Sequence, residues 1–326
     1  MTRKKTFTPI PAPAQLPDAE VIDPKEVLQA YLDGEIDLIC VVGPTASGKT
    51  RYAVGLARKI NELLGEAKAE IISADSRQVY RGMDIGTGKD LSEYEEIPYH
   101  LMDIVDAGEK YNIFEYQRDF EKAYKDIRNR ECVPILCGGS GLYVEAATCG
   151  YSLPEVPPNP ELRAELEKQD TELLVKRLAS LKPLHNSTDY DTRKRLIRAL
   201  EIAIYESEHP VNRSCYLPKS TYYIGTLVDR DTRNHKIDLR LDARLEEGMV
   251  DEIKSLIDGG VPPENLIYYG LEYKFVTQYI IGELTYDQMR TGLATAIHQF
   301  AKRQMTWFRG MERKGTIIHW TDAKYI

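Results

Sequence analysis

Cysteine is scarce in this sequence, and no two cysteines stand at a spacing typical of a metal or redox site. Five occur among 326 residues, an odd number, and none forms a Cys-x-x-Cys pair. We therefore expect reduced thiols in the core rather than disulfides or a zinc site.

Long apolar runs and a net positive charge are lacking as well. No stretch approaches the roughly eighteen uninterrupted apolar residues of a membrane-spanning helix, and the first residues do not form an apolar signal segment. The formal net charge is −8, which excludes a protein that coats nucleic acid over its whole surface. We expect a monomeric, cytoplasmic protein without a membrane partner.

Two local basic patches are nevertheless present. Each is consistent either with a solvated helix face or with a local contact to nucleic acid. They comprise Arg193, Lys194, Arg195 and Arg198, and, further along, Lys302, Arg303, Arg309, Arg313 and Lys314.

The most informative motif runs over residues 43–50, Gly-Pro-Thr-Ala-Ser-Gly-Lys-Thr, and satisfies G-x-x-x-x-G-K-T. An apolar run precedes it and helical spacing follows it, so the loop joins a strand to a helix as a phosphate grip requires. Lys49 supplies a positive charge, and the Thr50 hydroxyl can ligate Mg²⁺. The other predicted phosphate contacts in the loop are Gly43, Pro44, Ala46, Ser47 and Gly48.

Strand-like and helix-like segments alternate around this loop. We predict strands at residues 37–42, 69–74, 133–137, 222–228 and 316–320, and helices at 24–32, 49–64, about 114–128 and 141–149. Such alternation predicts an α/β fold, in which a P-loop NTPase-like parallel sheet is flanked by helices.

A proline-rich break at residues 153–160 indicates a domain boundary. Charged helices follow from 161 to about 206, with interruptions at 182–183 and 185–188, and helices dominate again to about 313. We predict a flexible tail and short helix at 1–35, a catalytic core at 36–150 and 225–326, and a mostly helical insertion at 151–224.

Two further segments follow predicted strands, and ligands in such sheets collect at the carboxyl ends of strands. Asp75 follows the second strand, where it could act as a general base, help to hold magnesium, or simply cap a helix. Gly138, Gly139 and Ser140 follow a later strand. Their backbone could approach an anion closely with a hydroxyl at hand, or form a tight turn without a ligand.

These motifs make the chain resemble the tRNA dimethylallyltransferases. The phosphate loop matches that family's version letter for letter, including Pro44 and Thr45. Residues 75–80, Asp-Ser-Arg-Gln-Val-Tyr, and the following 81–87 are similar to a second signature. Further similar segments occur in the family's order at 100–103, 138–143, 198–201 and 301–309, so the resemblance extends from about residue 37 to 320.

The resemblance implies transfer of a dimethylallyl group from dimethylallyl diphosphate to the exocyclic amine of an adenosine next to the tRNA anticodon. The phosphate loop would then hold a leaving diphosphate rather than ATP, with Lys49, Ser140 and magnesium neutralising the charge that develops. Thr45 would donate to the leaving oxygen, and Asp75 would accept the proton of the adenine amine.

Arg240 aligns with a family arginine and would clamp the diphosphate, unless it is only an exposed helix arginine. The target adenine must leave the stacked anticodon loop, so the enzyme also has to grip the anticodon stem-loop of tRNA. The resemblance assigns that grip to Arg163, Lys194, Arg195 and Arg198 in the insertion, and to Ser76, Arg77, Gln78, Lys274, Arg303 and Gln304 around the channel.

The chain departs from the family pattern in five places. Ser140 stands where threonine is usual, and Lys236 stands where the family commonly has a second arginine. Residues 86–90 read Gly-Thr-Gly-Lys-Asp where Gly-Thr-Ala-Lys-Pro is usual, residues 270–274 read Gly-Leu-Glu-Tyr-Lys where Gly-Tyr-Lys is usual, and residues 298–300 read His-Gln-Phe where Thr-Arg-Gln is usual.

Two other functions share parts of this pattern. An adenylate dimethylallyltransferase acting on AMP or ATP would share the phosphate loop and Asp75 but would not need the insertion. An ATP-dependent small-molecule kinase would share only the loop, and we would expect additional lid arginines over the phosphates.

Overall fold

The computed structural model describes residues 18–149, 156–182, 191–209 and 218–326. The chain divides into two compact units, one built from segments up to Thr148 and from Pro218 onward, the other lying between Cys149 and Leu217. The predicted flexible tail up to residue 17, the first part of the proline-rich break, the interruption at 185–188 and Cys215 lie outside the described residues.

A six-stranded sheet forms the base of the first unit. Its strand order is β3-β2-β4-β1-β5-β6, and every neighbouring pair is parallel. Every residue of β1, β2 and β4 is buried, as expected for parallel strands covered on both faces. The predicted α/β fold is confirmed. The strands are β1 (Leu38–Val42), β2 (Ala69–Ser73), β3 (Tyr99–His100), β4 (Val133–Gly138), β5 (Thr221–Leu227) and β6 (Ile318–Asp322).

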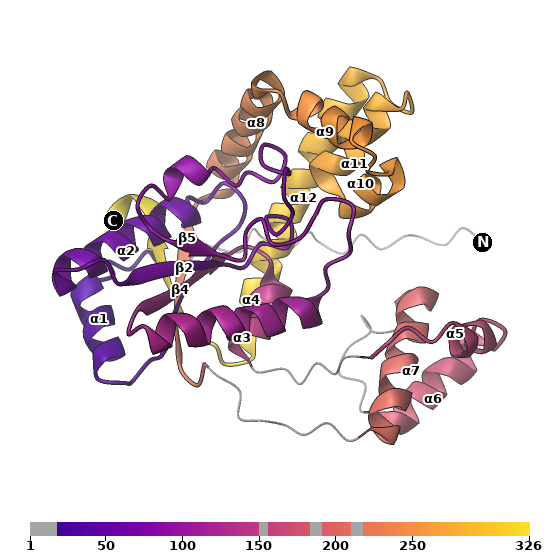
Figure 1. Cartoon of the computed structure of the whole chain (residues 1–326), viewed down its shortest axis with the longest axis horizontal. Helices are drawn as coiled ribbons and strands as arrows, with labels where there is room; N and C mark the ends of the chain where they lie inside the picture. The colour runs from indigo at the N-terminus through magenta and orange to yellow at the C-terminus, as the bar shows by residue number, and fades with distance from the viewer. Residues whose placement is uncertain (1–17, 150–155, 183–190, 210–217) are drawn as a thin grey trace, which may run out of the picture. The chain divides into compact units, whose positions relative to one another are not determined.

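Helices cover both faces of the sheet, and Figure 1 shows α2 and α3 on opposite sides of the strands. Glycines with positive φ lie at both ends of α2, Gly48 at 82° and Gly65 at 74°, and set its limits. A capping box of Asn112 and Glu115 starts α3. These helices are α1 (Pro24–Leu32), α2 (Lys49–Leu64), α3 (Ile113–Asn129) and α4 (Gly141–Thr148).

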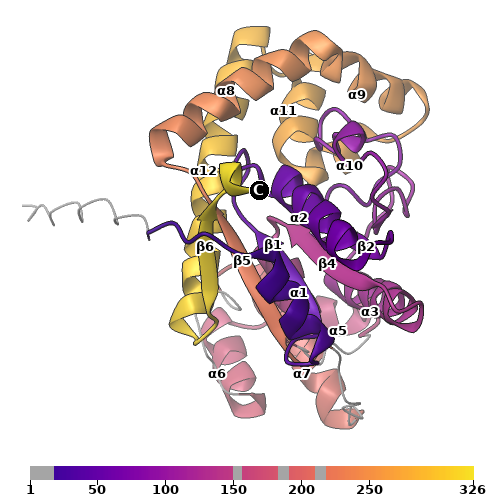
Figure 2. The same ribbon diagram turned by 90° about the vertical axis from the view of Figure 1, so that its left-hand side faces the viewer.

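A second group of helices gathers at the end of the sheet from which the chain leaves β5 (Figure 2). These helices share a core with Val79, Tyr80 and Met83 from the loop after β2. The packing places their inner faces next to the carboxyl ends of the strands. They are α8 (Arg230–Glu247), α9 (Met249–Asp258), α10 (Pro263–Tyr269), α11 (Leu271–Ile280) and α12 (Tyr286–Arg313).

Three helices account for most of the described residues of the second unit. It contains α5 (Pro160–Leu166), α6 (Thr171–Leu181) and α7 (Arg193–Glu208), which begin after the N-caps Asn159, Asp170 and Thr192. Leucines at helical spacing, among them Leu174, Leu178, Leu196 and Leu200, form its own core.

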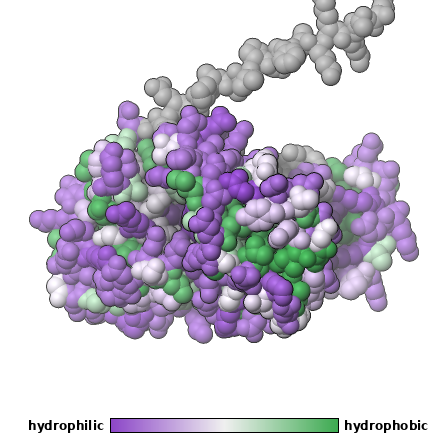
Figure 3. Space-filling model, turned by 90° about the horizontal axis from the view of Figure 1, so that it is seen from above, coloured by the Kyte–Doolittle hydropathy of each residue, from purple (hydrophilic) through white to green (hydrophobic). Residues whose placement is uncertain are grey.

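The surface of the described residues is mostly polar, as expected from the charged composition. The face seen in Figure 3 is mostly hydrophilic, with one hydrophobic area near the middle of the view. Among the described helices, none combines the length and the apolar character that a bilayer crossing requires.

Candidate active site

The phosphate loop lies between β1 and α2 and is fixed to β5. Ala46 and Gly48 have φ of 63° and 82°, which bends the loop. A Cβ on Gly43 would lie 2.2 Å from Thr226 Oγ1 and 2.5 Å from Ser47 Oγ, so this position needs glycine. The hydroxyls of Ser47 and Thr226 share a hydrogen bond of 2.6 Å. The loop therefore keeps one shape at the N-terminus of a helix, where anions bind favourably.

Lys49 and Asp75 lie close enough to influence each other electrostatically. Lys49 is the first residue of α2 and is half-buried. Burial lowers the pKa of its amine, while Cys137 and Asp75 act in the opposite direction. Within the described part of the chain, no carboxylate forms an ion pair with Lys49. Its charge is therefore available to an anion, and a bound anion would offset the cost of burying the amine.

The carboxylate of Asp75 also shapes its own loop. Its Oδ1 accepts a hydrogen bond of 2.9 Å from Arg77 N, and its backbone N–H donates to Ser73 Oγ at 3.3 Å. The first of these hydrogen bonds closes a local turn, and residues 76–79 form a turn rather than a helix, so the alternative that Asp75 caps a helix is wrong. The predicted role of Asp75 as a general base stays a prediction, and its place at the carboxyl end of β2 beside Lys49 suits that role.

Gln304 connects the phosphate loop to the glycine turn after β4. Its Oε1 accepts a hydrogen bond of 2.8 Å from Thr45 N, and its Nε2 donates to Gly139 O at 2.9 Å. A Cβ on Gly139 would lie 2.4 Å from that Nε2, and one on Gly138 would lie 2.2 Å from Ala74 O. Gln304 is 6% exposed, so its amide is engaged inside the protein, and its predicted contact with tRNA stays a prediction.

Ser140 joins the same turn to the loop that carries Asp75. Its hydroxyl accepts a hydrogen bond of 3.2 Å from Ser76 N. Its carbonyl accepts from Tyr143 N and Val144 N at 2.8 and 3.0 Å, which starts α4. The predicted donor hydroxyl thus lies where the carboxyl ends of β2 and β4 meet.

Arg240 lines a small pocket of mixed chemistry beside the phosphate loop. Aliphatic side chains, two guanidinium groups and one carboxylate meet there. Asp90 Oδ2 lies 2.5 Å from Arg240 Nη2 and 3.6 Å from Arg244 Nη2. The arginine is 34% exposed and is therefore not a freely solvated helix residue. The lining residues are Thr45, Ile237, Arg240, Leu241, Arg244, Glu272 and Ile297.

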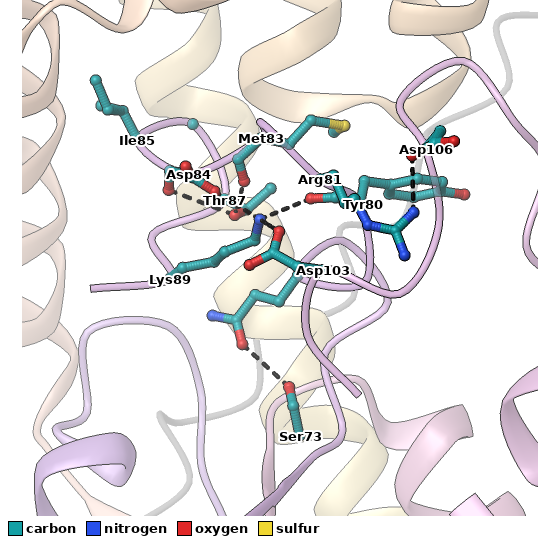
Figure 4. A network of polar contacts seen from close by, with 12 residues as sticks. Ser73, Tyr80, Arg81, Met83, Asp84, Ile85, Thr87, Lys89, Asp103 and Asp106 are labelled. Carbon is teal, nitrogen blue, oxygen red and sulfur yellow. Dashed lines mark hydrogen bonds and ion pairs between the residues drawn. The ribbon is translucent and has the colours of Figure 1, made fainter. Parts of the chain in front are cut away.

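The loop that carries Asp90 is held from inside by Lys89, as Figure 4 shows. The side chain of Lys89 is fully buried, and its amine donates to Tyr80 O and Asp84 Oδ1, both at 2.6 Å, and to Asp103. A buried ammonium needs such partners. Lys89 therefore fixes residues 80–90 as one folded segment and sets the position of Asp90 next to it.

The outer side of this loop is bound by Glu252 from α9. Its carboxylate accepts hydrogen bonds from the backbone N–H groups of Asp84, Ile85 and Gly86 at 2.8, 2.7 and 3.1 Å, and from Tyr273 Oη at 2.7 Å. Three successive amides around one carboxylate form an anion-binding nest that the protein fills itself. The loop is thereby tied to α9 and α11.

Of the cations predicted to contact tRNA in the first unit, three lie against aromatic rings. Arg77 lies 5.6 Å from the ring centroid of Tyr269, Lys274 lies 5.6 Å from that of Phe275, and Arg303 lies 5.9 Å from that of Phe300. Lys274 and Arg303 are exposed. A cation over a ring keeps its charge available to a phosphate.

Gln78 holds the loop after β2 to the glycine of the next loop. Its Oε1 accepts from Ser73 Oγ at 3.0 Å, and its Nε2 donates to Gly88 O at 3.1 Å. Both ends of the amide thus have protein partners, and its predicted contact with the channel stays a prediction.

In the second unit, two of the predicted tRNA-binding arginines hold a buried carboxylate. Glu201 is 2% exposed and accepts from Arg163 Nη2 at 2.7 Å, from Asn159 N at 2.7 Å and from Arg198. Burial alone would raise the pKa of Glu201, but these hydrogen bonds lower it to about 2. Arg163 and Arg198 therefore have a structural role, and any further contact with tRNA stays a prediction.

Lys194 and Arg195 are the exposed cations at the start of α7. Arg195 pairs with Asp191 at 2.6 Å, and within the described part of the chain Lys194 has no ion-pair partner. Exposed pairs of this kind contribute little to stability and exchange readily for another anion.

The structure also identifies residues at the candidate site that were not predicted from the sequence. Arg244, Asp90 and Glu272 lie at the pocket, and Lys89 and Glu252 hold its wall. Arg244 could have been found, because it stands four residues after Arg240 on one helix and hence on the same face. Asp90 and Glu272 lie in two of the departures from the family pattern, at 86–90 and 270–274.

A metal site made by the protein alone is absent from the described residues. No group of three His, Cys, Asp or Glu side chains there could hold an ion. Thr50, half-buried at the second position of α2, is the hydroxyl donor that such a loop offers. The donor set still fits Mg²⁺, which typically takes few protein ligands and completes its shell with phosphate oxygens and water.

Known protein families and relatives agree on one assignment. The family model described as IPP transferase matches residues 78–311. The tRNA dimethylallyltransferase 2 of Bacteroides fragilis (strain ATCC 25285) is 56% identical over 293 residues, which is 89% of this chain and 94% of that protein. A tRNA dimethylallyltransferase 2 of Porphyromonas gingivalis (strain W83) is 57% identical over 290 residues, which is 88% of this chain and 94% of that protein.

Solved structures give the same result. The full-length tRNA isopentenylpyrophosphate transferase of Bacillus halodurans has a TM-score of 0.62 at 34% identity, covering 88% of this chain and 90% of that one. A eukaryotic dimethylallyltransferase acting on tRNA has a TM-score of 0.70 at 26% identity, covering 88% of this chain and 73% of that one.

Proposed function

Because the chain belongs to the tRNA dimethylallyltransferase family, we propose that it transfers the dimethylallyl group of dimethylallyl diphosphate to the exocyclic amine of an adenosine adjacent to the tRNA anticodon, and releases diphosphate. One observation carries this proposal. The pocket beside Thr45 combines guanidinium groups with aliphatic side chains, which is the pairing that an isoprenoid diphosphate presents.

The donor would lie with its charge toward the cations and its tail toward the apolar lining. Ile237, Leu241 and Ile297 are 2%, 3% and 5% exposed and offer an apolar wall. Arg240 and Arg244 line the same pocket, and Lys49 lies near enough to Arg240 for the two charges to affect each other. An ATP γ-phosphate would have no use for the aliphatic wall, and a nucleoside alone would leave the cations without an anion.

The transfer step exchanges one bond for another. The bond between the adenine nitrogen and the allylic carbon forms while the bond from that carbon to the diphosphate oxygen breaks, and the electron pair leaves with diphosphate. Lys49, Arg240, the loop amides and the Ser140 hydroxyl stabilise the charge that develops, and Thr45 donates to the leaving oxygen. Asp75 takes the proton of the amine, whose lone pair is otherwise delocalised into the ring.

Magnesium would be held by the Thr50 hydroxyl together with diphosphate oxygens. When bound, it would neutralise charge on those oxygens.

The acceptor would be held by two sets of cations. Lys194 and Arg195 of the second unit would contact the backbone of the anticodon stem-loop, and Arg77, Lys274 and Arg303 of the first unit would lie along the path of the extruded base. Because the acceptor is tRNA, we place the reaction in the cytoplasm, and we propose that one chain suffices for it.

The experiment offers labelled dimethylallyl diphosphate and Mg²⁺ to the purified chain with unmodified tRNA, AMP or ATP as acceptor. We expect label in tRNA alone. Label in AMP or ATP without label in tRNA would instead establish an adenylate dimethylallyltransferase, and phosphate transfer from ATP to a small molecule would establish a kinase.

A further inference from the structure

Two arginines, not one, converge at the donor pocket. Arg240 and Arg244 stand one turn apart on α8 and both line the pocket beside Thr45. A Cβ on Gly88 would lie 1.7 Å from Arg244 Nη2 and 2.4 Å from Arg240 Nη2. The two guanidinium groups therefore meet over the same glycine, whose φ of 63° also excludes most other residues.

The carboxylates nearby do not fully satisfy these two cations. Asp90 gives one oxygen to both, at 2.5 Å from Arg240 Nη2 and 3.6 Å from Arg244 Nη2, and only the first distance is a hydrogen bond. Arg244 is 9% exposed, and its Nη2 is buried without a hydrogen-bond partner. A buried guanidinium N–H without an acceptor is unfavourable, so the pocket favours a further anion.

Burial disfavours the charged forms of both Arg244 and Glu272. Burial lowers the pKa of Arg244, and the positive charge of Arg240 lowers it further. Burial raises the pKa of Glu272, which lines the same pocket. A dianionic group placed between the arginines would stabilise both cations at once, since it brings more charge than the shared oxygen of Asp90 supplies.

We propose that Arg244 is a second anion-binding arginine of this pocket, which holds the diphosphate of the donor together with Arg240. This inference rests on the proposed function. A diphosphate has oxygens enough for two planar guanidinium forks, whereas Asp90 occupies only one nitrogen of the nearer arginine. A purely structural role for Arg244 would leave its buried Nη2 without a hydrogen-bond acceptor.

The test is calorimetric titration of inorganic pyrophosphate with Mg²⁺ into the full-length chain and its variants. We expect Arg244→Gln to weaken pyrophosphate binding by roughly tenfold or more, and Arg244→Lys to weaken it less, because an ammonium keeps the charge but not the fork. The matched control is Arg290→Gln. Arg290 lies on α12 and pairs with Asp242 of α8, the helix that carries Arg244, but it does not line the pocket. This control variant should change the affinity less than about twofold.

The outcomes separate this inference from the proposed function. Parental affinity in a folded Arg244→Gln chain would overturn the role of Arg244 and leave the donor site in place. A parent that fails to bind pyrophosphate would overturn the proposed function and this inference with it. If Arg244→Gln does not fold, Arg244→Lys decides, and parental affinity there together with parental transfer rates would contradict a bidentate contact.

Discussion

At the scale of single residues, Asp75 is the proposed general base. We expect Asp75→Asn to lower the single-turnover transfer rate by about 100-fold to 10,000-fold, because the amide cannot accept the proton of the adenine amine. Pyrophosphate and tRNA binding should stay near parental values, since the amide can still accept the hydrogen bond from Arg77 N.

Rapid quenching of one turnover with saturating enzyme measures that rate directly. A rate within about threefold of the parent would show that another group takes the proton.

Asp90 offers a second test at the same scale, with the opposite sign. Its carboxylate accepts a hydrogen bond of 2.5 Å from Arg240 Nη2, where it would compete with the proposed donor diphosphate for the arginine. Asp90→Asn should therefore tighten pyrophosphate binding several-fold, as expected when a competing charge is removed. Calorimetry should show that Asp90→Asn and Arg244→Gln change the affinity for pyrophosphate in opposite directions. Weaker pyrophosphate binding by Asp90→Asn would mean that Asp90 aligns Arg240 instead.

At the scale of elements, the loop from Tyr80 to Asp90 depends on a buried amine. Lys89→Met should lower the free energy of unfolding by about 3 kcal/mol, the lower end for a broken buried ion pair, because Asp84 and Asp103 are 54% and 34% exposed. Urea unfolding checks this, with Lys59→Met, an exposed lysine of α2, as the control. Equal midpoints for Lys89→Met and the parent would contradict the buried role.

Glu201 on α7 holds α5 through Arg163 and Asn159, which makes the stability of the second unit dependent on acid. The pKa of Glu201 is lowered from 4.5 to about 2, so its contribution is present above about pH 4.5 and is lost as the pH falls toward 2. We expect the parent to lose about 2 kcal/mol more than Glu201→Gln between pH 6 and pH 3.

Urea unfolding of the full chain at several pH values measures the difference. Glu70, whose pKa is also lowered to about 2 by Arg130, is unchanged in both proteins and cancels. Parallel pH profiles would exclude Glu201 as the acid-sensitive contact.

The sequence predicted the elements that have strong local signals. The predicted helix at 49–64 agrees with α2, and the predicted strand at 37–42 differs from β1 by one residue, because glycine caps and continuous apolar runs mark their limits. The short strand β3 was missed, since two residues without full burial carry no periodic pattern. The predicted last strand at 316–320 begins two residues later as β6.

The site was predictable only in part, for a physical reason. The phosphate loop, Asp75 and Ser140 follow strands, so the parallel sheet brings them together. Arg244, Asp90 and Glu272 come from helices and a loop whose packing no local pattern specifies, and a helix arginine in a sequence resembles any solvated cation. Gln304 and Gln78 were expected at the channel, but their internal hydrogen bonds could not be read from residue types.

At the scale of the whole molecule, the chain combines a net negative charge with local cations on both units. We expect Arg195→Ala to weaken tRNA binding about threefold to tenfold and to reduce the salt dependence of binding by about one counterion. Pyrophosphate affinity should not change. Lys59→Ala serves as the control for loss of one exposed charge. Binding titrations at several salt concentrations check this, and an unchanged salt slope would exclude Arg195 from the interface.

The central claim is that the chain transfers the dimethylallyl group of dimethylallyl diphosphate to tRNA and releases diphosphate. Its most direct test incubates the purified chain with dimethylallyl diphosphate, Mg²⁺ and unmodified tRNA, digests the RNA to nucleosides and measures both products. We expect one adenosine next to the anticodon to carry a dimethylallyl group, with diphosphate released in equal amount. Diphosphate release without modified adenosine, or modification of a free nucleotide in place of tRNA, would contradict it.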